Sequence, residues 1–463
     1  MNTFKMKNPM ANIRLFFIIL IVGWASISCQ QASVDEPLAS QVNHPEWSVN
    51  ANIYEVNIRQ FTPEGTFNAF AAHLDRLQEM GVDILWFMPI TPIGELNRKG
   101  SLGSYYSVKD YTGINPEFGT IEDFRNLVDE IHARGMYVIL DWVANHTAWD
   151  HPWTVTRPEF YTKDEQGNFV PPIEDWSDVI DLDYSNMELW DVMIGEMRYW
   201  VEEINVDGFR CDVADMVPTE FWDRARAELE AIKPVFMLAE AETPELHMHA
   251  FEAAYGWHFH HVMNRVAAGE ETVAAIDKYF FEDHAFDFPK GSYKMYFITN
   301  HDENSWAGTE FTRLGAGVEA FAVLTATIPG MVLLYNGQEA AFDSMLEFFE
   351  KDEIDWGTYQ YHDFYMQLLR LKNRNQALWN GLAGGDMQRV HTNNDECIFA
   401  FVRQKDNEQV FVVLNLSGQE LEVAFDGEHF LGTYTELFSG APWQFNETSS
   451  IIMDPWGYFV FER

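Results

Sequence analysis

Six ionisable side chains stand at the ends of short apolar segments that have the composition of β-strands. In chain order they are His146, Arg210, Asp212, Glu240, His301 and Asp302. Two carboxyl groups can divide the roles of nucleophile and general acid, and an adjacent cation keeps the nucleophile ionised. Buried acids are costly unless they are paired or functional. A set of unrelated salt bridges would not recur at strand ends in this way, so the pattern indicates one active site.

The elements that must position these residues alternate along the chain from about residue 48. Amphipathic helices separate eight expected strands, which are 51–56, 83–88, 137–141, 206–212, 235–240, 255–259, 295–299 and 331–335. Strands separated by helices form parallel sheets. The α/β pattern therefore predicts a closed (β/α)8 TIM barrel, in which the carboxyl ends of the strands share one mouth. A doubly wound open sheet is the alternative fold.

Two segments depart from this alternation. Residues 147–186, which are rich in proline, follow the third expected strand and predict a small insertion there. The barrel is expected to span residues 48–380. Beyond it, short alternating apolar runs separated by turn residues predict a C-terminal all-β domain, a β-sandwich over 381–463.

The strand-end residues, taken in order, resemble the conserved regions of the α-amylase family of glycoside hydrolases. The matching stretches are 88–92, 106–111, 115–120, 141–146, 208–212, 240, 300–302 and 336–339. The resemblance covers about residues 48–460. It implies that Asp212 is the nucleophile, Glu240 the general acid/base and Asp302 a third carboxylate that holds sugar hydroxyls.

The resemblance also implies substrate-binding roles outside these three carboxylates. His146 and His301 would hydrogen-bond the sugar at the cleavage position, and Tyr106 would stack under its ring. Arg210 lies two residues before Asp212 on the same strand face, where its charge keeps that carboxylate ionised. Glu242, two residues after Glu240, is an alternative acid that we expect to lie beyond the strand.

Metal sites have weaker support in the sequence. Asn145 matches a calcium ligand of the family, and hard cations prefer oxygen donors. However, Asp215 and Met216 replace the Lys-His pair of many calcium-dependent amylases, and the following loop has no Asp-rich cluster. We expect no required cofactor, with calcium as a secondary prediction. The cluster His258, His260 and His261 lacks neighbouring cysteines and does not predict zinc.

The charge balance excludes one class of partner. The chain of 463 residues has 30 Lys and Arg against 72 Asp and Glu, a formal net charge of −42. Such a field repels phosphate backbones, so a nucleic-acid partner is not expected. Nucleotide-binding glycine loops and the serine-esterase motif are absent from the sequence.

The first residues are typical of an export signal. Lys5, Lys7 and Arg14 precede an apolar run, and small residues then precede Cys29. Residues 1–29 resemble a bacterial lipoprotein signal peptide in which Cys29 would carry lipid. An ordinary signal peptide and an uncleaved anchor are the alternatives. Residues 30–47 would form a polar tether, so we expect an exported protein that touches the cell-envelope membrane only through its anchor or signal segment.

Together these features predict a retaining glycoside hydrolase that cleaves α-glucosidic bonds in starch-type glucans or maltooligosaccharides. A covalent glycosyl–Asp212 intermediate would carry the reaction. Two alternatives stay open. One is an α-glucan transglycosylase or isomerase on the same scaffold, and the other is a non-catalytic glucan-binding surface lipoprotein.

Overall fold

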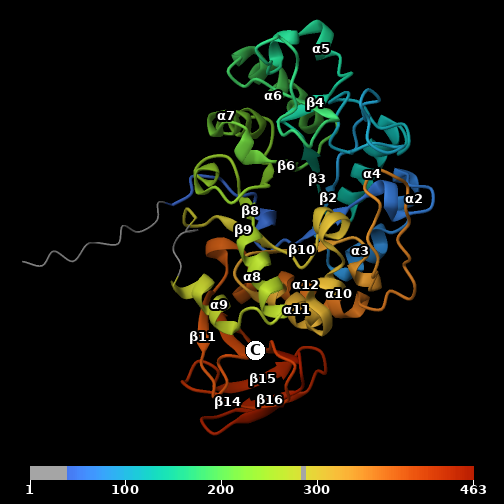
Figure 1. Ribbon diagram of the computed structural model, residues 1–463. Coiled ribbons are helices and arrows are strands. Elements are labelled where there is room, and N and C mark those ends of the chain that lie inside the picture. The colour runs from blue at the N-terminus through green and yellow to red at the C-terminus, as the bar shows by residue number, and fades with distance from the viewer. Residues whose placement is uncertain (1–38, 283–287) are drawn as a thin grey trace, which may run out of the picture. The chain divides into compact units, whose positions relative to one another are not determined.

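The computed structural model describes residues 39–282 and 288–463, and the signal segment with Cys29 lies outside the described residues. Eight parallel strands close into a barrel in the order β1-β10-β9-β8-β7-β6-β3-β2. Figure 1 shows β6, β3 and β2 of this barrel side by side. Their bounds are β1 Ile53–Val56, β2 Ile84–Phe87, β3 Tyr137–Trp142, β6 Gly208–Cys211, β7 Phe236–Ala239, β8 Ala253–Tyr255, β9 Tyr293–Tyr296 and β10 Met331–Tyr335. The predicted (β/α)8 barrel is confirmed, and the open-sheet alternative is wrong because β1 pairs with both β2 and β10.

The helices follow the strands around this barrel. They are α1 Ile58–Phe61, α2 Phe67–Ala71, α3 Leu74–Met80, α4 Ile121–Ala133, α6 Met187–Glu202, α7 Thr219–Glu230, α8 Trp257–Ala267, α9 Val273–Asp277, α10 Glu310–Leu314, α11 Val318–Thr327 and α12 His362–Arg374. Helix α4 begins with a capping box, in which Thr120 and Asp123 satisfy each other's backbone N–H groups. Among the described residues, no helix is both long and apolar enough to cross a lipid bilayer.

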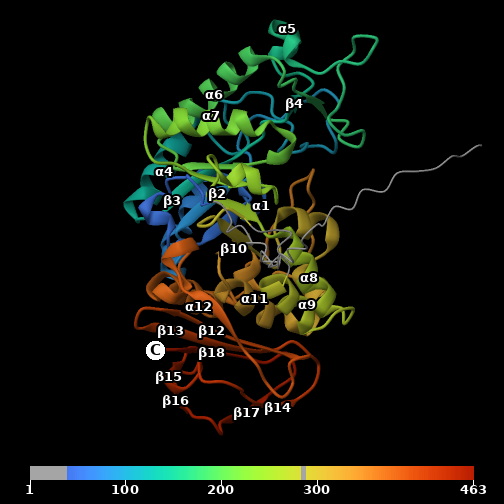
Figure 2. The ribbon, with the colours of Figure 1, turned by 90° about the vertical axis from the view of Figure 1, so that its left-hand side faces the viewer.

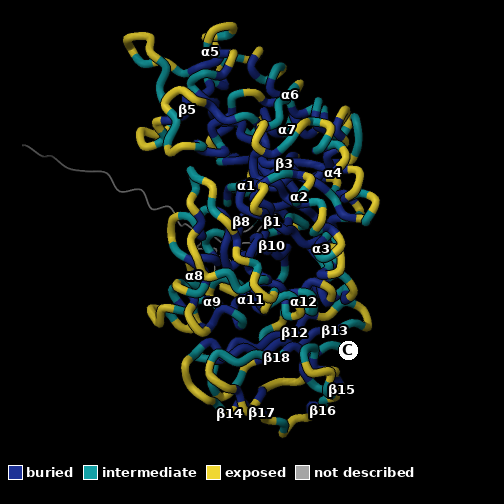
Figure 3. Tube along the Cα trace, turned by 90° about the vertical axis from the view of Figure 1, so that its right-hand side faces the viewer, coloured by how far each residue is buried: buried dark blue, intermediate teal, exposed yellow. Residues whose placement is uncertain are grey.

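Alternation along each strand divides the barrel core into two layers. In β2, Ile84 and Trp86 point into the barrel, where they join Ile139 of β3 and Phe236 of β7. The intervening Leu85 belongs to the larger cluster between strands and helices. Because successive side chains of a strand face opposite sides, one apolar run fills both layers. Figure 3 shows the resulting buried strands inside more exposed loops and helices.

One expected strand is misplaced. The prediction of a strand at 255–259 is wrong, because β8 ends at Tyr255 and α8 begins at Trp257. The buried residues Phe259, Val262 and Val266 have helical spacing and form the buried face of α8. This helical pattern overlaps the short apolar run that suggested a strand. The strand instead begins two residues earlier, at Ala253.

The insertion after β3 contains a small antiparallel pair. Strand β4, His146–Ala148, pairs with β5, Val179–Asp181, and the short helix α5, Trp153–Thr156, lies between them in sequence. His146 is the first residue of β4, so this pair places a predicted binding residue directly after the barrel strand β3.

The C-terminal residues form the all-β domain that the sequence predicts. A six-stranded sheet has the order β11-β12-β13-β18-β15-β16, and β14 pairs with β17. The bounds are β11 Asp386–Val390, β12 Ile398–Lys405, β13 Glu408–Asn415, β14 Leu421–Ala424, β15 Gly432–Glu436, β16 Pro442–Phe445, β17 Ser450–Met453 and β18 Tyr458–Glu462. Val423 and Met453 of the small sheet share one buried cluster with Phe411 of the large sheet.

A buried arginine ties this domain to the barrel. Figure 2 shows α11 and α12 next to the sheet that contains β12, β13 and β18, and α11 is in contact with β13. Arg403 of β12 is 1% exposed and donates to the carbonyls of Ile328 and Trp379. Because a buried guanidinium needs several acceptors, these bonds fix the sheet against the chain segments that follow α11 and α12.

A backbone contact at the start of β6 gives a test of the barrel packing. Gly208 has φ +153°, and a Cβ at this position would lie 1.8 Å from the carbonyl oxygen of Phe236 on β7. That oxygen belongs to the neighbouring barrel strand and cannot move away. We expect Gly208→Ala to destabilise the fold by about 3 kcal/mol or more, measured as a drop in the thermal unfolding midpoint.

The matched control is Gly195→Ala in α6. Apart from the adjacent residues and the backbone of the helix itself, no atom would lie within 4 Å of the new Cβ, and alanine favours a helix over glycine by about 1 kcal/mol. This variant should therefore unfold at the same or a higher temperature. An unchanged midpoint in Gly208→Ala would contradict the close β6–β7 approach.

Candidate active site

Arg210 occupies the centre of the barrel mouth and binds three carboxylates. Its side chain is fully buried, and Nη1 donates to Asp141 Oδ1 at 2.7 Å and to Asp212 Oδ1 at 3.0 Å. Nη2 forms an ion pair of 2.8 Å with Glu240 Oε2, and Nε donates to the Tyr255 hydroxyl. One guanidinium therefore brings the carboxyl groups of β3, β6 and β7 together.

Asp141 is the structural member of this group. Its side chain is fully buried, and its Oδ2 accepts from Trp86 Nε1 at 3.2 Å and from the Tyr106 hydroxyl at 3.0 Å. With Arg210 on Oδ1, both oxygens of the carboxylate are hydrogen-bonded. Asp141 therefore orients Arg210 and Tyr106.

Asp212 and Glu240 differ from Asp141 in their access to solvent. Their side chains are 10% and 14% exposed, so both can reach a molecule in the mouth. Burial, partly offset by Arg210, raises the pKa of Asp212 to about 6 and that of Glu240 to about 7. Glu240 therefore has the higher pKa of the two and holds its proton more tightly. A proton donor requires the higher pKa, and a nucleophile requires the lower one.

A strained backbone helps to hold Glu240. Val213 adopts a left-handed φ of +38°, which is rare for a β-branched residue, and its N–H donates to Glu240 Oε2 at 2.9 Å. Oε2 therefore has both Val213 and Arg210 beside it. Strain of this kind is kept where the surrounding structure enforces it, often at functional sites.

His301 links the third carboxylate to the rest of the site. Its Nε2 lies 2.8 Å from the Tyr106 hydroxyl and 3.3 Å from Asp302 Oδ2, and its Nδ1 lies 2.5 Å from Glu55 Oε1. Burial opposes a charge here, but Asp302 and Glu55 outweigh it and raise the pKa of His301 to about 9. The imidazole is therefore a cation at neutral pH and donates from both nitrogens. Asp302 itself is 36% exposed.

His146 lies in a drier environment than His301. It is 3% exposed and packs against Trp176 of the insertion, with ring centroids 5.5 Å apart. Burial lowers its pKa to about 4, so the ring is neutral. Its neighbour Asn145 uses its backbone carbonyl to accept from Leu182 at 3.1 Å. Neither residue has a direct contact with the three carboxylates around Arg210 among the interactions of the described residues.

Glu242, the alternative acid, has a different role. Its Oε2 accepts from the backbone N–H of His258 at 2.8 Å, near the start of α8. A carboxylate at this position is stabilised by the helix dipole. His260 is likewise engaged, with Glu303 3.0 Å from its Nε2. Over residues 39–282 and 288–463, no group of three or more His, Cys, Asp or Glu side chains could hold a metal ion.

The sequence prediction missed one ionisable member of the site and assigned no role to another. Glu55 is fully buried on β1, and Asp141 stands within a predicted motif without an assigned function. An acid in the middle of an otherwise apolar strand is a signal that could have identified Glu55. Its partner His301 is 246 residues away, and the pairing depends on the closure of the barrel between β1 and β10.

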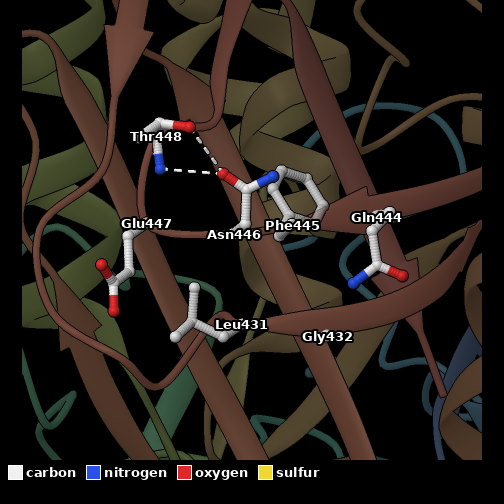
Figure 4. A pocket seen from close by; sticks show the side chains of 7 residues that line it. All are labelled: Leu431, Gly432, Gln444, Phe445, Asn446, Glu447 and Thr448. Atoms are coloured by element: carbon white, nitrogen blue, oxygen red, sulfur yellow. Dashed lines mark hydrogen bonds between the residues drawn. The ribbon is translucent and has the colours of Figure 1, made fainter.

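A separate hollow lies on the C-terminal domain and contains none of these groups. Figure 4 shows its lining side chains, among which Thr448 donates to Asn446 from both its N–H and its hydroxyl. Glu447 is its one ionisable group. It offers no pair of acids, so we assign the chemistry to the barrel mouth.

Two family models match the chain. "Alpha amylase, catalytic domain" matches residues 40–173 and 173–409, and "Maltogenic Amylase, C-terminal domain" matches 387–460. A solved maltogenic alpha-amylase from Thermotoga neapolitana is 30% identical, with a TM-score of 0.81 over 89% of this chain and 98% of the other.

Curated relatives agree with this match. Alpha-amylase 3 of Dictyoglomus thermophilum is 25% identical over 460 residues, covering 83% of this chain and 88% of its own. A trehalose synthase of Pimelobacter sp. is 35% identical over 207 residues, which cover 36% of this chain and 35% of its own.

The Glu55–His301 pair generates a pH-dependent prediction. The folded-state pKa of His301 lies above its ordinary value near 6.5. The pair therefore stabilises the fold fully below about pH 6.5, and this contribution is lost as the pH rises through about 9. Glu55→Gln keeps an acceptor but removes a charge, so we expect the pKa of His301 to fall. NMR titration of the imidazole protons measures it.

The control for this experiment is Glu159→Gln, a substitution at an exposed carboxylate. It should leave the His301 titration unchanged. An identical His301 pKa in Glu55→Gln and in the unmodified protein would show that the proton is not held by this pair.

Proposed function

Because the chain belongs to the alpha-amylase family, we propose that it hydrolyses α-glucosidic bonds in starch-type glucans or maltooligosaccharides with retention of configuration. The observation that carries this proposal is the guanidinium of Arg210, which lies within 3.0 Å of oxygens from both Asp212 and Glu240. A retaining mechanism needs two carboxyl groups this close to one scissile bond, one to attack and one to protonate.

The first half of the reaction breaks the glycosidic bond. Arg210 holds Asp212 Oδ1, so Asp212 Oδ2 attacks the anomeric carbon and forms the glycosyl ester. Glu240 Oε2 lies beside Arg210 and accepts from Val213, so the transferable proton is on Oε1. That proton passes to the leaving oxygen as its bond to the anomeric carbon breaks.

The second half restores the enzyme. Ionised Glu240 takes a proton from water, the resulting hydroxide oxygen bonds to the anomeric carbon, and the ester bond to Asp212 breaks. Two inversions give net retention. Asp302, which is partly exposed, would bind sugar hydroxyls, while the His301 cation beside it and neutral His146 would hydrogen-bond the same sugar. Tyr106 would stack under the ring.

Transfer to a sugar hydroxyl in place of water is the second candidate, and the similarity to a trehalose synthase favours keeping it. The two reactions share every step up to the glycosyl–Asp212 ester. They differ only in which oxygen enters afterwards. A non-catalytic binding module has less support, because all three carboxylates are present and two of them share Arg210.

The test is product analysis by NMR with maltoheptaose, pullulan, isomaltose and trehalose as substrates. We expect maltoheptaose to give shorter products whose new reducing ends are first seen as the α-anomer. Longer or isomeric products would support transfer. Initial release of the β-anomer would overturn retention.

Substitution of the nucleophile provides the matched variant. Asp212→Asn should lower kcat by about 10³- to 10⁵-fold, while calorimetry should still detect binding of maltoheptaose. Glu159→Gln, at an exposed carboxylate, serves as the control. Near-native turnover by Asp212→Asn would exclude it as nucleophile.

We also propose that no metal ion is required. The side-chain amide of Asn145 lies beside the His146 ring, and the backbone carbonyl of Asn145 already accepts from the Leu182 N–H. Dialysis against EDTA should leave kcat and the unfolding midpoint unchanged. A fall in either that is restored by calcium alone would show that a calcium site is present.

The proposed location is the bacterial cell envelope, with a lipid on Cys29. The support is the sequence of residues 1–29. The prediction of a tether over 30–47 is wrong for the last part of that range, because Ser40 donates to the His247 carbonyl and Trp47 stacks on Tyr137 of β3. Expressed in a bacterial host, the chain should incorporate labelled palmitate and fractionate with membranes, and Cys29→Ser should do neither. Cys397→Ser, at a free cysteine of the C-terminal domain, is the control. Label retained in Cys29→Ser would refute this site.

A further inference from the structure

A row of aromatic rings leads away from the proposed catalytic residues. Tyr106 stacks on His301 with centroids 5.5 Å apart, and Phe348 lies parallel to Tyr106 at 6.2 Å and 9°. Trp306 follows at 5.3 Å from Phe348. The row ends in solvent, because the Trp306 side chain is 58% exposed while Tyr106 is only partly accessible.

The exposed ring is held by a rigid backbone. Trp306 lies in a π-helical turn, Glu303–Ala307, that starts directly after Asp302. Asn304 of this turn is 2% exposed, donates to the Ser344 carbonyl at 3.0 Å and accepts from the Leu346 N–H at 2.9 Å. The turn is thereby bonded to the loop that carries Phe348.

That loop is fixed from the opposite side as well. Gln60, fully buried in α1, donates to the carbonyls of Glu347 and Glu350, both at 2.9 Å. A large ring left in solvent on such a framework gains nothing for folding. Preorganised exposed aromatic groups are instead typical of binding surfaces.

The surroundings define the chemistry of the ligand. Glu347 and Asp343 are exposed on the same loop, and Asp302 precedes the turn. These carboxylates repel anions and accept hydrogen bonds from hydroxyl groups. An exposed apolar ring, on segments that also carry exposed acceptors, fits a neutral sugar ring, whose C–H face stacks and whose hydroxyls donate.

We propose that Trp306, with Phe348 beside it, binds a sugar unit of the glucan outside the cleavage position and thereby sets the preference for longer chains. The inference rests on the proposed function. Because the row of rings is continuous with Tyr106, the sugar at Trp306 would be a further unit of the glucan whose cleaved unit lies at Tyr106. Substrates too short to reach Trp306 would not use this position.

The experiment compares Trp306→Ala with the unmodified protein on maltotriose, maltopentaose and maltoheptaose. We expect KM for maltoheptaose to rise by about 3- to 10-fold, the range of a single aromatic stack, with little change for maltotriose. Trp306→Phe should recover most of the loss. Ile452→Ala, at an exposed residue of β17, is the control and should change neither substrate.

Calorimetry in the Asp212→Asn background separates this inference from the proposed function. If the unmodified protein does not turn over maltoheptaose, the function fails, yet weaker binding of maltoheptaose in Asp212→Asn/Trp306→Ala would still support the sugar position. Equal affinity with and without Trp306, or equal weakening for all chain lengths, would overturn it. If Trp306 binds a protein partner instead, the affinity for maltoheptaose will be the same with and without Trp306.

Discussion

The buried guanidinium of Arg210 is the interaction on which the rest of the site depends. It has no solvent contact, so its charge is stable only because Asp141, Asp212 and Glu240 surround it. These carboxylates come from three barrel strands, and without the cation they would repel one another at short range. A buried charge that loses its partner costs several kcal/mol, about 3–5 in measured cases. Arg210 therefore assembles the acids.

Acidic groups outnumber cations at the mouth of the barrel, and this excess helps to set the pKa values on which the proposed reaction depends. Two cations, Arg210 and His301, face five acids, namely Glu55, Asp141, Asp212, Glu240 and Asp302. Burial and the surplus negative charge raise the pKa of Glu240, so that it retains a proton near neutral pH. The pKa of Asp212, about 6, is the lower of the two, so Asp212 gives up its proton first. One environment thus suits both the proton donor and the ionised nucleophile of the proposed mechanism.

The hydrogen bonds around Arg210 continue to the aromatic residues that are proposed to bind the sugar. Tyr106 donates to Asp141 and bonds His301, so the ring proposed to stack under the sugar is oriented by two charged groups. The row of rings that starts there continues to Trp306. Asn304 and Gln60, which are far apart in sequence, both bind the loop that carries Phe348 and so fix the position of this row. Binding groups are thereby held by the barrel and not left to flexible loops.

The alternation of strands and helices and the acids at strand ends could be predicted from the sequence, because apolar periodicity and residue type are local properties. The roles proposed for Asp212, Glu240 and Asp302 come instead from the resemblance to the family. The strand predicted at 255–259 is misplaced, because a short apolar run fits both the period of a strand and the period of a helix. Which charges pair depends on the three-dimensional fold. Glu55 meets His301 across 246 residues, and Val213 takes a left-handed backbone to reach Glu240. Such contacts depend on barrel closure and strand register, which bring distant residues together and which no local pattern encodes.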